Sequence, residues 1–343
     1  MIHRNRFRDN LGWLSSFLLI FACTATSQEQ ESAKAPEEAE APIPVIFDTD
    51  IGTDIDDTWA LAQLLASPEL DLRLVVTDSG DTETRARIVA KMLEAAGRTD
   101  VPIGIGVPEP EAENLPIGQA PWADDVNLDE YPGTVYRDGV GALIDVVKAS
   151  EVPVTLLAVG PVPNLVSALE REPSLAQRVR VVAMSGSVDR GYDRAAEPSA
   201  EYNVAARVPA AKQLYGAGWD LLIAPLDTAG QLQVTGDAYR RLVESESRTV
   251  QALLEGYRVW EPTFQWGDFD VDRESSVLFD ALAVALAYDE SLCTTPTLDL
   301  IVTDDGFTRR DDDGKPTRVC LEWTEGARER LQDDLVVRLL RLP

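Results

Sequence analysis

The segment from Asp48 to Asp57 carries five aspartates within ten residues. Crowding like charges raises the free energy of a folded chain unless a cation neutralises them, so this segment predicts a bound metal ion. Carboxylate oxygens favour calcium or magnesium over zinc. The single histidine of the sequence is His3, in a segment that has the pattern of an export signal, so a histidine-ligated metal is excluded from the mature chain. We therefore expect a hard divalent cation.

The elements on either side place this segment in a loop. Residues 44–47 form an apolar run, which predicts a β-strand that ends at Asp48. Residues 57–66 have Trp59 and Leu61 among apolar residues at helical spacing, which predicts a helix. An EF-hand calcium loop has a similar acidic composition, but an EF-hand needs a helix before the loop, where a strand is predicted here.

Strands and helices alternate along the chain that follows. Strands are predicted at 72–76, 101–105, 154–158 and 179–184, and helices at 83–96, 140–149 and 164–170. This alternation predicts a single-domain α/β fold with a doubly wound, mostly parallel sheet and a Rossmann-like core. The sequence shows no internal repeat and no interdomain linker.

Polar residues follow several of the predicted strands. Asp78 and Asp81 come after the second strand, residues 160–164 after a later one, and Ser185 begins the next loop. In doubly wound sheets, ligands bind outside the carboxyl ends of the strands. We therefore expect one site, assembled from these loops and the acidic segment.

The charge of the chain narrows the classes of ligand. The 343 residues carry a formal net charge of −28 at pH 7. Nucleic-acid binding depends on clustered lysines and arginines, so a nucleic-acid partner is excluded. A metal ion, or a neutral or cationic small molecule, fits this charge better, although most of the acidic residues are explained by a well-solvated surface.

The N-terminal residues 1–27 have the pattern of a bacterial export signal. Arginines precede an apolar run, residues 11–22, that is short for a membrane span. The residues before Cys23 resemble a lipobox, which would make the protein a lipoprotein attached to the membrane; an ordinary signal peptide is the alternative. Residues 28–44 predict a disordered linker, which leaves residues 45–343 as the folded domain. We expect a periplasmic protein or an outer-membrane-anchored lipoprotein.

Two cysteines, Cys293 and Cys320, lie in the predicted folded domain. An oxidising compartment would allow them to form a disulfide. Two buried free thiols are an equally good interpretation.

Four segments, in order, resemble the inosine-uridine-preferring nucleoside hydrolase family. The first has the pattern of the family's N-terminal signature, in a variant with a longer loop. The segments are 48–61, 156–165, 201–203 and 277–283, and the resemblance extends from residue 45 to about residue 290. It implies hydrolysis of the N-glycosidic bond of a ribonucleoside or related N-riboside, with calcium as the cofactor. It also implies a homo-oligomer, because members commonly form dimers or tetramers.

The resemblance also implies roles for individual residues. Calcium would be bound by Asp50, Asp57, Asp280 and the backbone carbonyl of Pro163, which stands where the family usually has threonine. Asp50 would also be the general base that activates the attacking water. The remaining implied residues contact the ribose, and these are Asp56, Asp81, Glu201 and Asn203.

Some residues depart from the family pattern. Phe279 stands where many members have a histidine that assists the leaving base, and the mature chain has no other histidine. Asp81 and Ala195 fall at or near positions where asparagine is common. The aromatic residues between 257 and 269 offer flat faces for a nucleobase or pack in the core, and these are Tyr257, Trp260, Phe264, Trp266 and Phe269.

Other polar residues have a simpler interpretation. Asp48 is expected to support the loop rather than bind metal, and Asp54 to be a solvated loop residue. Residues 311–314 predict a turn between two late strands. Glu201 and Asn203 would also serve as a helix cap.

Three functions remain open at this point. The first is calcium-dependent riboside hydrolysis. The second is a non-catalytic, calcium-stabilised nucleoside- or sugar-binding protein at the cell surface, which the departures at Phe279 and Ala195 favour. The third is a phosphohydrolase with an aspartate nucleophile, but the matching loops offer neither the lysine nor the phosphate-binding amides that such chemistry needs. The sequence does not define the base preference.

Overall fold

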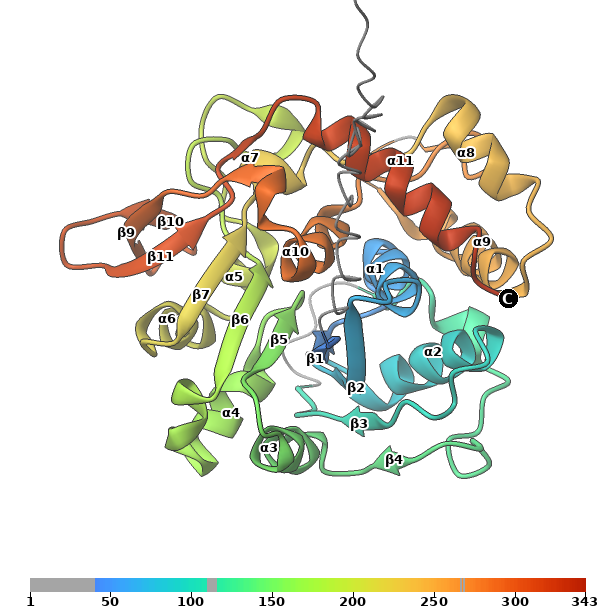
Figure 1. Ribbon diagram of the computed structural model, residues 1–343, viewed down its shortest axis with the longest axis horizontal. Coiled ribbons are helices and arrows are strands. Elements are labelled where there is room, and N and C mark those ends of the chain that lie inside the picture. The colour runs from blue at the N-terminus through green and yellow to red at the C-terminus, as the bar shows by residue number, and fades with distance from the viewer. Residues whose placement is uncertain (1–40, 110–115, 266, 268) are drawn as a thin grey trace, which may run out of the picture. The chain divides into compact units, whose positions relative to one another are not determined.

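The predicted alternation of strands and helices is present in the computed structural model of the protein (Figure 1). The structure describes residues 41–109, 116–265, 267 and 269–343. The predicted export signal, most of the predicted linker and Trp266 lie outside the described residues. Within those ranges, no helix has both the length and the apolar character needed to cross a membrane.

The central sheet has ten strands among the described residues, in the order β10-β9-β11-β7-β6-β5-β1-β2-β3-β4. Its strands are β1 (Ile43–Thr49), β2 (Leu70–Thr77), β3 (Ile103–Ile105), β4 (Val135–Tyr136), β5 (Val154–Ala158), β6 (Val179–Met184), β7 (Asp220–Ala224), β9 (Thr297–Val302), β10 (Thr308–Arg310) and β11 (Lys315–Val319). All neighbouring strands from β11 to β4 in this order are parallel. Strand β9 is antiparallel to both of its neighbours, β10 and β11. The predicted α/β fold with a doubly wound, mostly parallel sheet is therefore confirmed.

The chain reverses its direction of growth across the sheet between β1 and β5. From β1 the sheet extends through β2 and β3 to β4, and the chain then returns to pair β5 with the other side of β1. The loops that leave the carboxyl ends of β1 and β5 consequently turn toward opposite faces of the sheet. Such a switch point opens a crevice for ligands.

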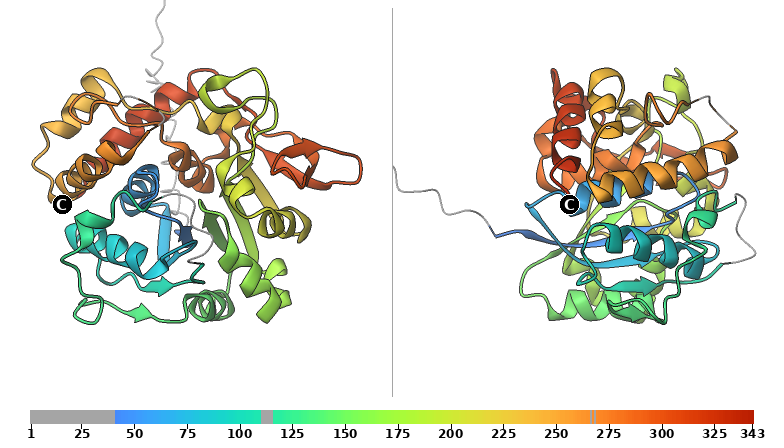
Figure 2. Two further views of the ribbon diagram at one scale, coloured as in Figure 1. Left: turned by 180° about the vertical axis from the view of Figure 1, so that it is seen from behind. Right: turned by 90° about the vertical axis from the view of Figure 1, so that its right-hand side faces the viewer.

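Alternating side chains divide the core into two clusters, one on each face of the sheet. In β1, Val45 and Phe47 belong to one cluster, whereas Ile46 belongs to the other, as the two-residue period of a strand requires. The first cluster includes residues of α1, α2, α9, α10 and α11, and the second includes residues of α3, α4 and α6. The views in Figure 2 show helices on both faces. All residues of β5, and those of β1 from Val45 onward, are buried, which explains the continuous apolar runs of these two strands.

The helices, with their bounds, are α1 (Asp56–Leu65), α2 (Thr82–Ala95), α3 (Gly139–Ala149), α4 (Pro163–Arg171), α5 (Tyr202–Ala206), α6 (Val208–Gly216), α7 (Leu226–Ala229), α8 (Gly236–Val243), α9 (Arg248–Trp260), α10 (Phe279–Tyr288) and α11 (Ala327–Leu339). Each helix and strand predicted up to residue 184 begins and ends within two residues of its observed bounds. β1 begins at Ile43, two residues before the predicted domain boundary.

A second, two-stranded sheet lies near the C-terminal part of the chain. It pairs β8 (Cys293–Thr294) with β12 (Glu322–Trp323). Cys293 forms a disulfide with Cys320, with their Cα atoms 5.2 Å apart, so the structure favours the first of the two interpretations of these cysteines. Residues 311–314 form the predicted turn, which joins β10 to β11 on either side of β9.

Candidate active site

A cavity of about 610 Å³ opens at the carboxyl ends of β1, β5 and β6. Asp50 follows β1, Val159 follows β5, and Met184 ends β6, and all three line the cavity. The start of α10 contributes Phe279 and Asp280 to the same wall. The site therefore lies at the switch point of the sheet, where a doubly wound fold places its ligands.

The acidic loop between β1 and α1 is held by hydrogen bonds from its own residues and from α2. Gly52 has a φ of +103°, a backbone conformation that residues with a side chain rarely adopt. This glycine allows the chain to turn directly after β1. The Thr49 hydroxyl donates to the Asp57 carboxylate and accepts from the amide of Ile51. Arg85 of α2 donates to the Ile51 carbonyl at 3.0 Å. The loop conformation is thus fixed from both sides.

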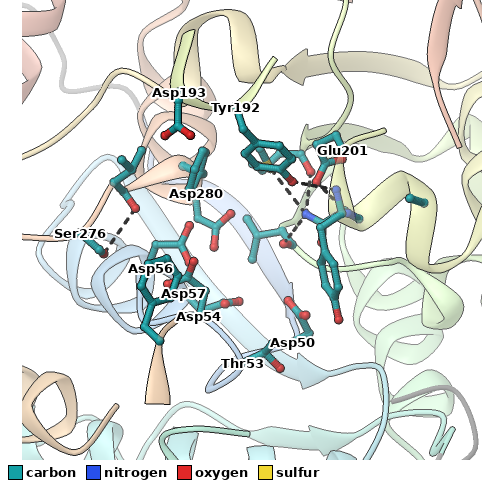
Figure 3. Close-up of a pocket in the computed structure, with 18 of the residues that line it drawn as sticks. Asp50, Thr53, Asp54, Asp56, Asp57, Tyr192, Asp193, Glu201, Ser276 and Asp280 are labelled. Atoms are coloured by element: carbon teal, nitrogen blue, oxygen red, sulfur yellow. Dashed lines mark hydrogen bonds between the residues drawn. The ribbon is translucent and has the colours of Figure 1, made fainter. Parts of the chain in front are cut away.

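Three buried carboxylates converge at one end of the cavity. Asp56 and Asp57 occupy the first turn of α1, and Asp280 occupies the first turn of α10. Each offers one oxygen, and these oxygens all lie within 4.8 Å of one another. Helix α1 packs against α10, so residues from the beginning and the end of the domain meet at this point. Figure 3 shows the three side chains directed toward one another.

The electrostatics of this carboxylate cluster fit a bound cation. Burial raises the pKa of Asp56, Asp57 and Asp280 well above the ordinary range, and the neighbouring carboxylates raise each pKa further. All donors are oxygens and all three residues are buried, which suits a hard divalent ion. A cation would offset the repulsion and keep the carboxylates charged.

The raised pKa values predict an unusual pH dependence of stability. In the unfolded chain these carboxyls titrate near 3.8, so above that pH the folded chain binds more protons than the unfolded chain. We expect the metal-free protein to lose stability as pH rises above about 4. Thermal unfolding of dialysed protein at pH 5 and pH 8 measures this loss. A divalent cation in excess should raise the melting temperature more at pH 8 than at pH 5. An equal rise at both pH values would contradict cation binding by these three carboxylates.

Asp50 lies in the same cavity, apart from the three clustered carboxylates (Figure 3). Its side chain is buried, and burial raises its pKa to about 7, with Asp78 adding to the rise and Arg85 opposing it. A carboxyl with a pKa near neutrality is suited to accept a proton at neutral pH. Asp50 therefore has the surroundings expected of a general base.

Glu201 and Asn203 combine the two roles considered for them. The Glu201 carboxylate caps α5 by accepting from the amide of Asn203 at 2.7 Å, and it also accepts from the amide of Gly186 at 2.9 Å. The side-chain amide of Asn203 donates to the backbone carbonyls of Val159 and Met184. Both side chains nevertheless line the cavity, and burial raises the pKa of Glu201 to about 7.

Asp81 and Pro163 lie outside the set of cavity-lining residues. The Asp81 carboxylate accepts from the backbone amide and the hydroxyl of Thr84, as the N-cap of α2. Pro163 is buried at the first position of α4. A ribose contact from Asp81 would require its carboxylate to leave the helix cap, so that role stays a prediction.

Asp48 and Asp78 form a buried layer behind the cavity. Asp48 accepts from the amide of Asn164 at 3.0 Å, and Asp78 accepts from the backbone of Val162 at 3.1 Å. Burial raises the pKa of Asp48 to about 6. Asp48 has no exposed surface and does not line the cavity, in keeping with the supporting role expected for it.

Several lining residues were not expected from the sequence. Asp54 is partly buried and lines the cavity, whereas a solvated loop residue was expected. Tyr192 and Asp193, from the loop between β6 and α5, also line it. The N-terminal motif contained a signal for Asp54, because it lies inside the acidic segment. Nothing in the local sequence distinguished Tyr192.

The aromatic residues between 257 and 269 divide between core and cavity. Tyr257 and Trp260 are buried in the core, whereas Phe264 and Phe269 line the cavity with ring centroids 5.3 Å apart. Phe279 lines the cavity next to Asp280. The cavity therefore combines a carboxylate end with aromatic walls, an arrangement that accommodates a polar sugar and a flat heterocycle.

Residues 45–329 match the inosine-uridine preferring nucleoside hydrolase family. This match covers most of the chain, so the chain belongs to that family, as the sequence motifs predicted. Enzymes of this family are N-ribohydrolases, which cleave N-glycosidic bonds, and the protein is therefore an enzyme of that class.

Particular relatives resemble the chain over most of its length. It is 31% identical over 269 residues to the pyrimidine-specific ribonucleoside hydrolase RihA of Enterobacter sp. (strain 638), a match that covers 74% of this chain and 81% of RihA. The solved plant nucleoside hydrolase PpNRh1 has a TM-score of 0.70 and 25% identity, over 88% of this chain and 100% of that chain. The purine-preferring ribonucleoside hydrolase from Gardnerella vaginalis shares the fold, with a TM-score of 0.70 and 22% identity over 87% of this chain and 98% of its own.

Proposed function

We propose that the protein hydrolyses the N-glycosidic bond of a ribonucleoside or related N-riboside in a calcium-dependent reaction that yields free base and ribose. One observation carries this proposal. Carboxylates from the first turn of α1 and the first turn of α10 meet in one cavity, with the candidate base Asp50 beside them. Family membership supplies the reaction class, and the oxygen-only donor set supports calcium.

We propose Asp57 and Asp280 as calcium ligands, with Asp50 and the carbonyl of Pro163 completing the protein ligands. Asp57 and Asp280 belong to the convergent cluster, which supports their assignment directly. Asp50 shares the cavity and raises the pKa of both Asp57 and Asp280 by its charge. When bound, calcium would supply positive charge that orients the attacking water and the ribose hydroxyls.

Asp50 then acts as the general base. Its carboxylate takes a proton from water, the water oxygen bonds to C1′ of the ribose, and the bond from C1′ to the base nitrogen breaks. The electron pair of that bond leaves with the base, which takes a proton from solvent. The pKa of about 7, raised mainly by burial, makes the Asp50 carboxylate a stronger base than an exposed aspartate.

Asp56, Glu201 and Asn203 are proposed to hold the ribose. Asp56 projects an acceptor into the carboxylate end, and Glu201 and Asn203 lie at the start of α5. The negative charges of Asp56 and Glu201 also favour a transition state in which the ribose ring resembles an oxocarbenium ion. Charge in this pocket thus supports both binding and reaction.

A non-catalytic binding protein is the second candidate function, and Phe279 is the observation that favours it. Phe279 lines the cavity and cannot donate a proton to a departing base. A binding protein would retain the calcium cluster and the sugar contacts without turnover.

We also propose that the protein is exported from a bacterial cytoplasm, either into the periplasm or as an outer-membrane lipoprotein acylated at Cys23. The disulfide between Cys293 and Cys320 supports export, because such bonds persist mainly in oxidising compartments. The basic and apolar pattern of residues 1–27 is the other support.

A substrate scan with calcium control tests the proposed function. Dialysed protein is assayed with p-nitrophenyl riboside, uridine, inosine and p-nitrophenyl phosphate, before and after calcium is added, and calcium binding is measured by calorimetry. We expect riboside turnover only with calcium, and no phosphate release. Uridine and inosine are both included because the named relatives act on pyrimidine and purine nucleosides. Calcium binding without turnover would favour the binding protein, and phosphate release would favour a phosphohydrolase.

A further inference from the structure

Tyr192 is an unassigned aromatic residue on the cavity wall. It lies in the loop between β6 and α5, and 37% of its surface is exposed, which is unusual for a large aromatic side chain in this structure. Its ring meets the ring of Phe279 edge to face, with centroids 6.1 Å apart and planes at 80°. Figure 3 shows Tyr192 between Asp280 and Glu201. An exposed aromatic face inside a cavity indicates contact with a ligand.

The Tyr192 hydroxyl accepts one hydrogen bond and has its donor hydrogen free among the described residues. Its oxygen accepts from the backbone amide of Tyr202 at 2.9 Å. A phenol also carries one donor hydrogen, and no acceptor for it is found among the described residues. Although part of the ring is exposed, the hydroxyl lies in enclosed surroundings, and this partial burial, together with the charge of Glu201, raises the pKa of Tyr192. The hydroxyl therefore stays protonated at neutral pH. It remains available as a neutral donor.

The backbone around Tyr192 is strained and firmly braced. Asp193 and Arg194 have φ values of 53° and 60°, in the left-handed region that non-glycine residues rarely adopt. Such strain persists only where surrounding contacts determine the conformation, and it concentrates at ligand sites. Here the Asp227 carboxylate of α7 accepts from three successive amides, those of residues 188–190, and the Ser199 hydroxyl accepts from the amide of Tyr192. The braced turn fixes the ring of Tyr192 in the cavity wall.

We propose that Tyr192 contacts the departing base and donates a hydrogen bond to a carbonyl oxygen or an unprotonated ring nitrogen of that base. This assignment rests on the proposed riboside hydrolysis. As the bond from C1′ to the base nitrogen breaks, its electron pair passes to the base, and the phenol stabilises the growing negative charge. The phenol keeps its proton, and the base takes its own from solvent. Phe279, which lacks a donor, packs against the ring that supplies one.

Tyr202 also lines the cavity but is placed differently. The charges that act on its hydroxyl include Asp50 and Arg85, whereas those that act on Tyr192 are Glu201, Asp54 and Asp56. Tyr202 has no ring contact with Phe279 among the described residues. Tyr192 is therefore the tyrosine assigned to the base.

A comparison of leaving groups tests this assignment. The variants are Tyr192→Phe and, as a matched control, Tyr136→Phe, which alters an exposed tyrosine of β4 outside the cavity. We expect Tyr192→Phe to lower kcat/KM for uridine and inosine by about tenfold or more. The loss for p-nitrophenyl riboside should be several times smaller, because nitrophenolate leaves without assistance. The control should match the unaltered protein on every substrate, and the melting temperature should be retained in both variants.

The outcomes separate the two levels of the proposal. Equal losses for nucleosides and for p-nitrophenyl riboside, or no loss for either, would overturn the assignment of Tyr192 while leaving riboside hydrolysis intact. No riboside turnover by the unaltered protein with calcium would overturn the proposed function, and this assignment with it.

Discussion

Replacing Asp50 with asparagine is expected to lower kcat for p-nitrophenyl riboside by about 10²- to 10⁴-fold at saturating calcium. Asparagine keeps the size of the side chain but cannot accept a proton from water. The position is 5% exposed and its backbone carbonyl accepts from Arg85, so the substitution preserves the packing of the loop. Steady-state assays at a series of calcium concentrations separate the loss of the general base from any loss of calcium affinity.

The control for this variant is Asp145→Asn. Asp145 is an exposed carboxylate on α3 that does not line the cavity, and its loss changes the net charge by the same amount. We expect this control to retain the unaltered rate. If Asp50→Asn also turned over the riboside at the unaltered rate, another residue would have to be the base.

Replacing Asp280 with asparagine is expected to have opposite effects on metal binding and on metal-free stability. The dissociation constant for calcium should rise by about 10- to 100-fold, because one full ligand charge is lost. The metal-free protein should become more stable, because burial and the charges of Asp56 and Asp57 raise the pKa of Asp280, and a neutral amide removes that repulsion. Calorimetry and thermal unfolding of dialysed protein measure the two effects.

Asp237→Asn provides a matched control for that variant. Asp237 also lies in the first turn of a helix, α8, but it is exposed and forms an ion pair with Arg240. We expect unchanged calcium affinity, and a slightly lower stability because the helix dipole loses a favourable charge. A calcium affinity that stays the same in Asp280→Asn would remove Asp280 from the metal site.

The first half of the fold was predictable because its strands are buried on both faces. β1, β5 and β6 read as apolar runs, and the helices between them have a clear apolar periodicity. The later strands lack that signal. β9 and β11 mix exposed, half-buried and buried residues and include charged residues, so their pairing depends on neighbours distant in sequence.

The candidate site was predictable where a motif fixed the residues and unpredictable where long-range contacts did. Asp57 and Asp280 follow from family motifs, and the packing of α1 against α10 brings them together. Asp54 depends on the turn at Gly52, which aims its side chain at the cavity. The position of Tyr192 depends on the Asp227 carboxylate, which accepts from the amides of residues 188–190, and on the amide of Tyr202, which donates to the Tyr192 hydroxyl. Neither contact is implied by the sequence around Tyr192.

Asp81 illustrates a different limit. Aspartate is both a common ribose acceptor in a site and a favoured residue at the start of a helix, and the sequence alone does not separate these uses. In the structure the carboxylate serves the helix, because the amide and the hydroxyl of Thr84 are within reach of it.

The two edges of the central sheet restrict how subunits of this protein can associate. The edge strands β10 and β4 have three and two residues, so each presents few unpaired backbone groups. Arginines stand at both edges, namely Arg309 and Arg310 in β10 and Arg137 directly after β4. Short, charged edges oppose strand addition from another chain. The subunit interface of a homo-oligomer would therefore have to be formed by helices or loops, and no sheet would continue from one subunit into the next.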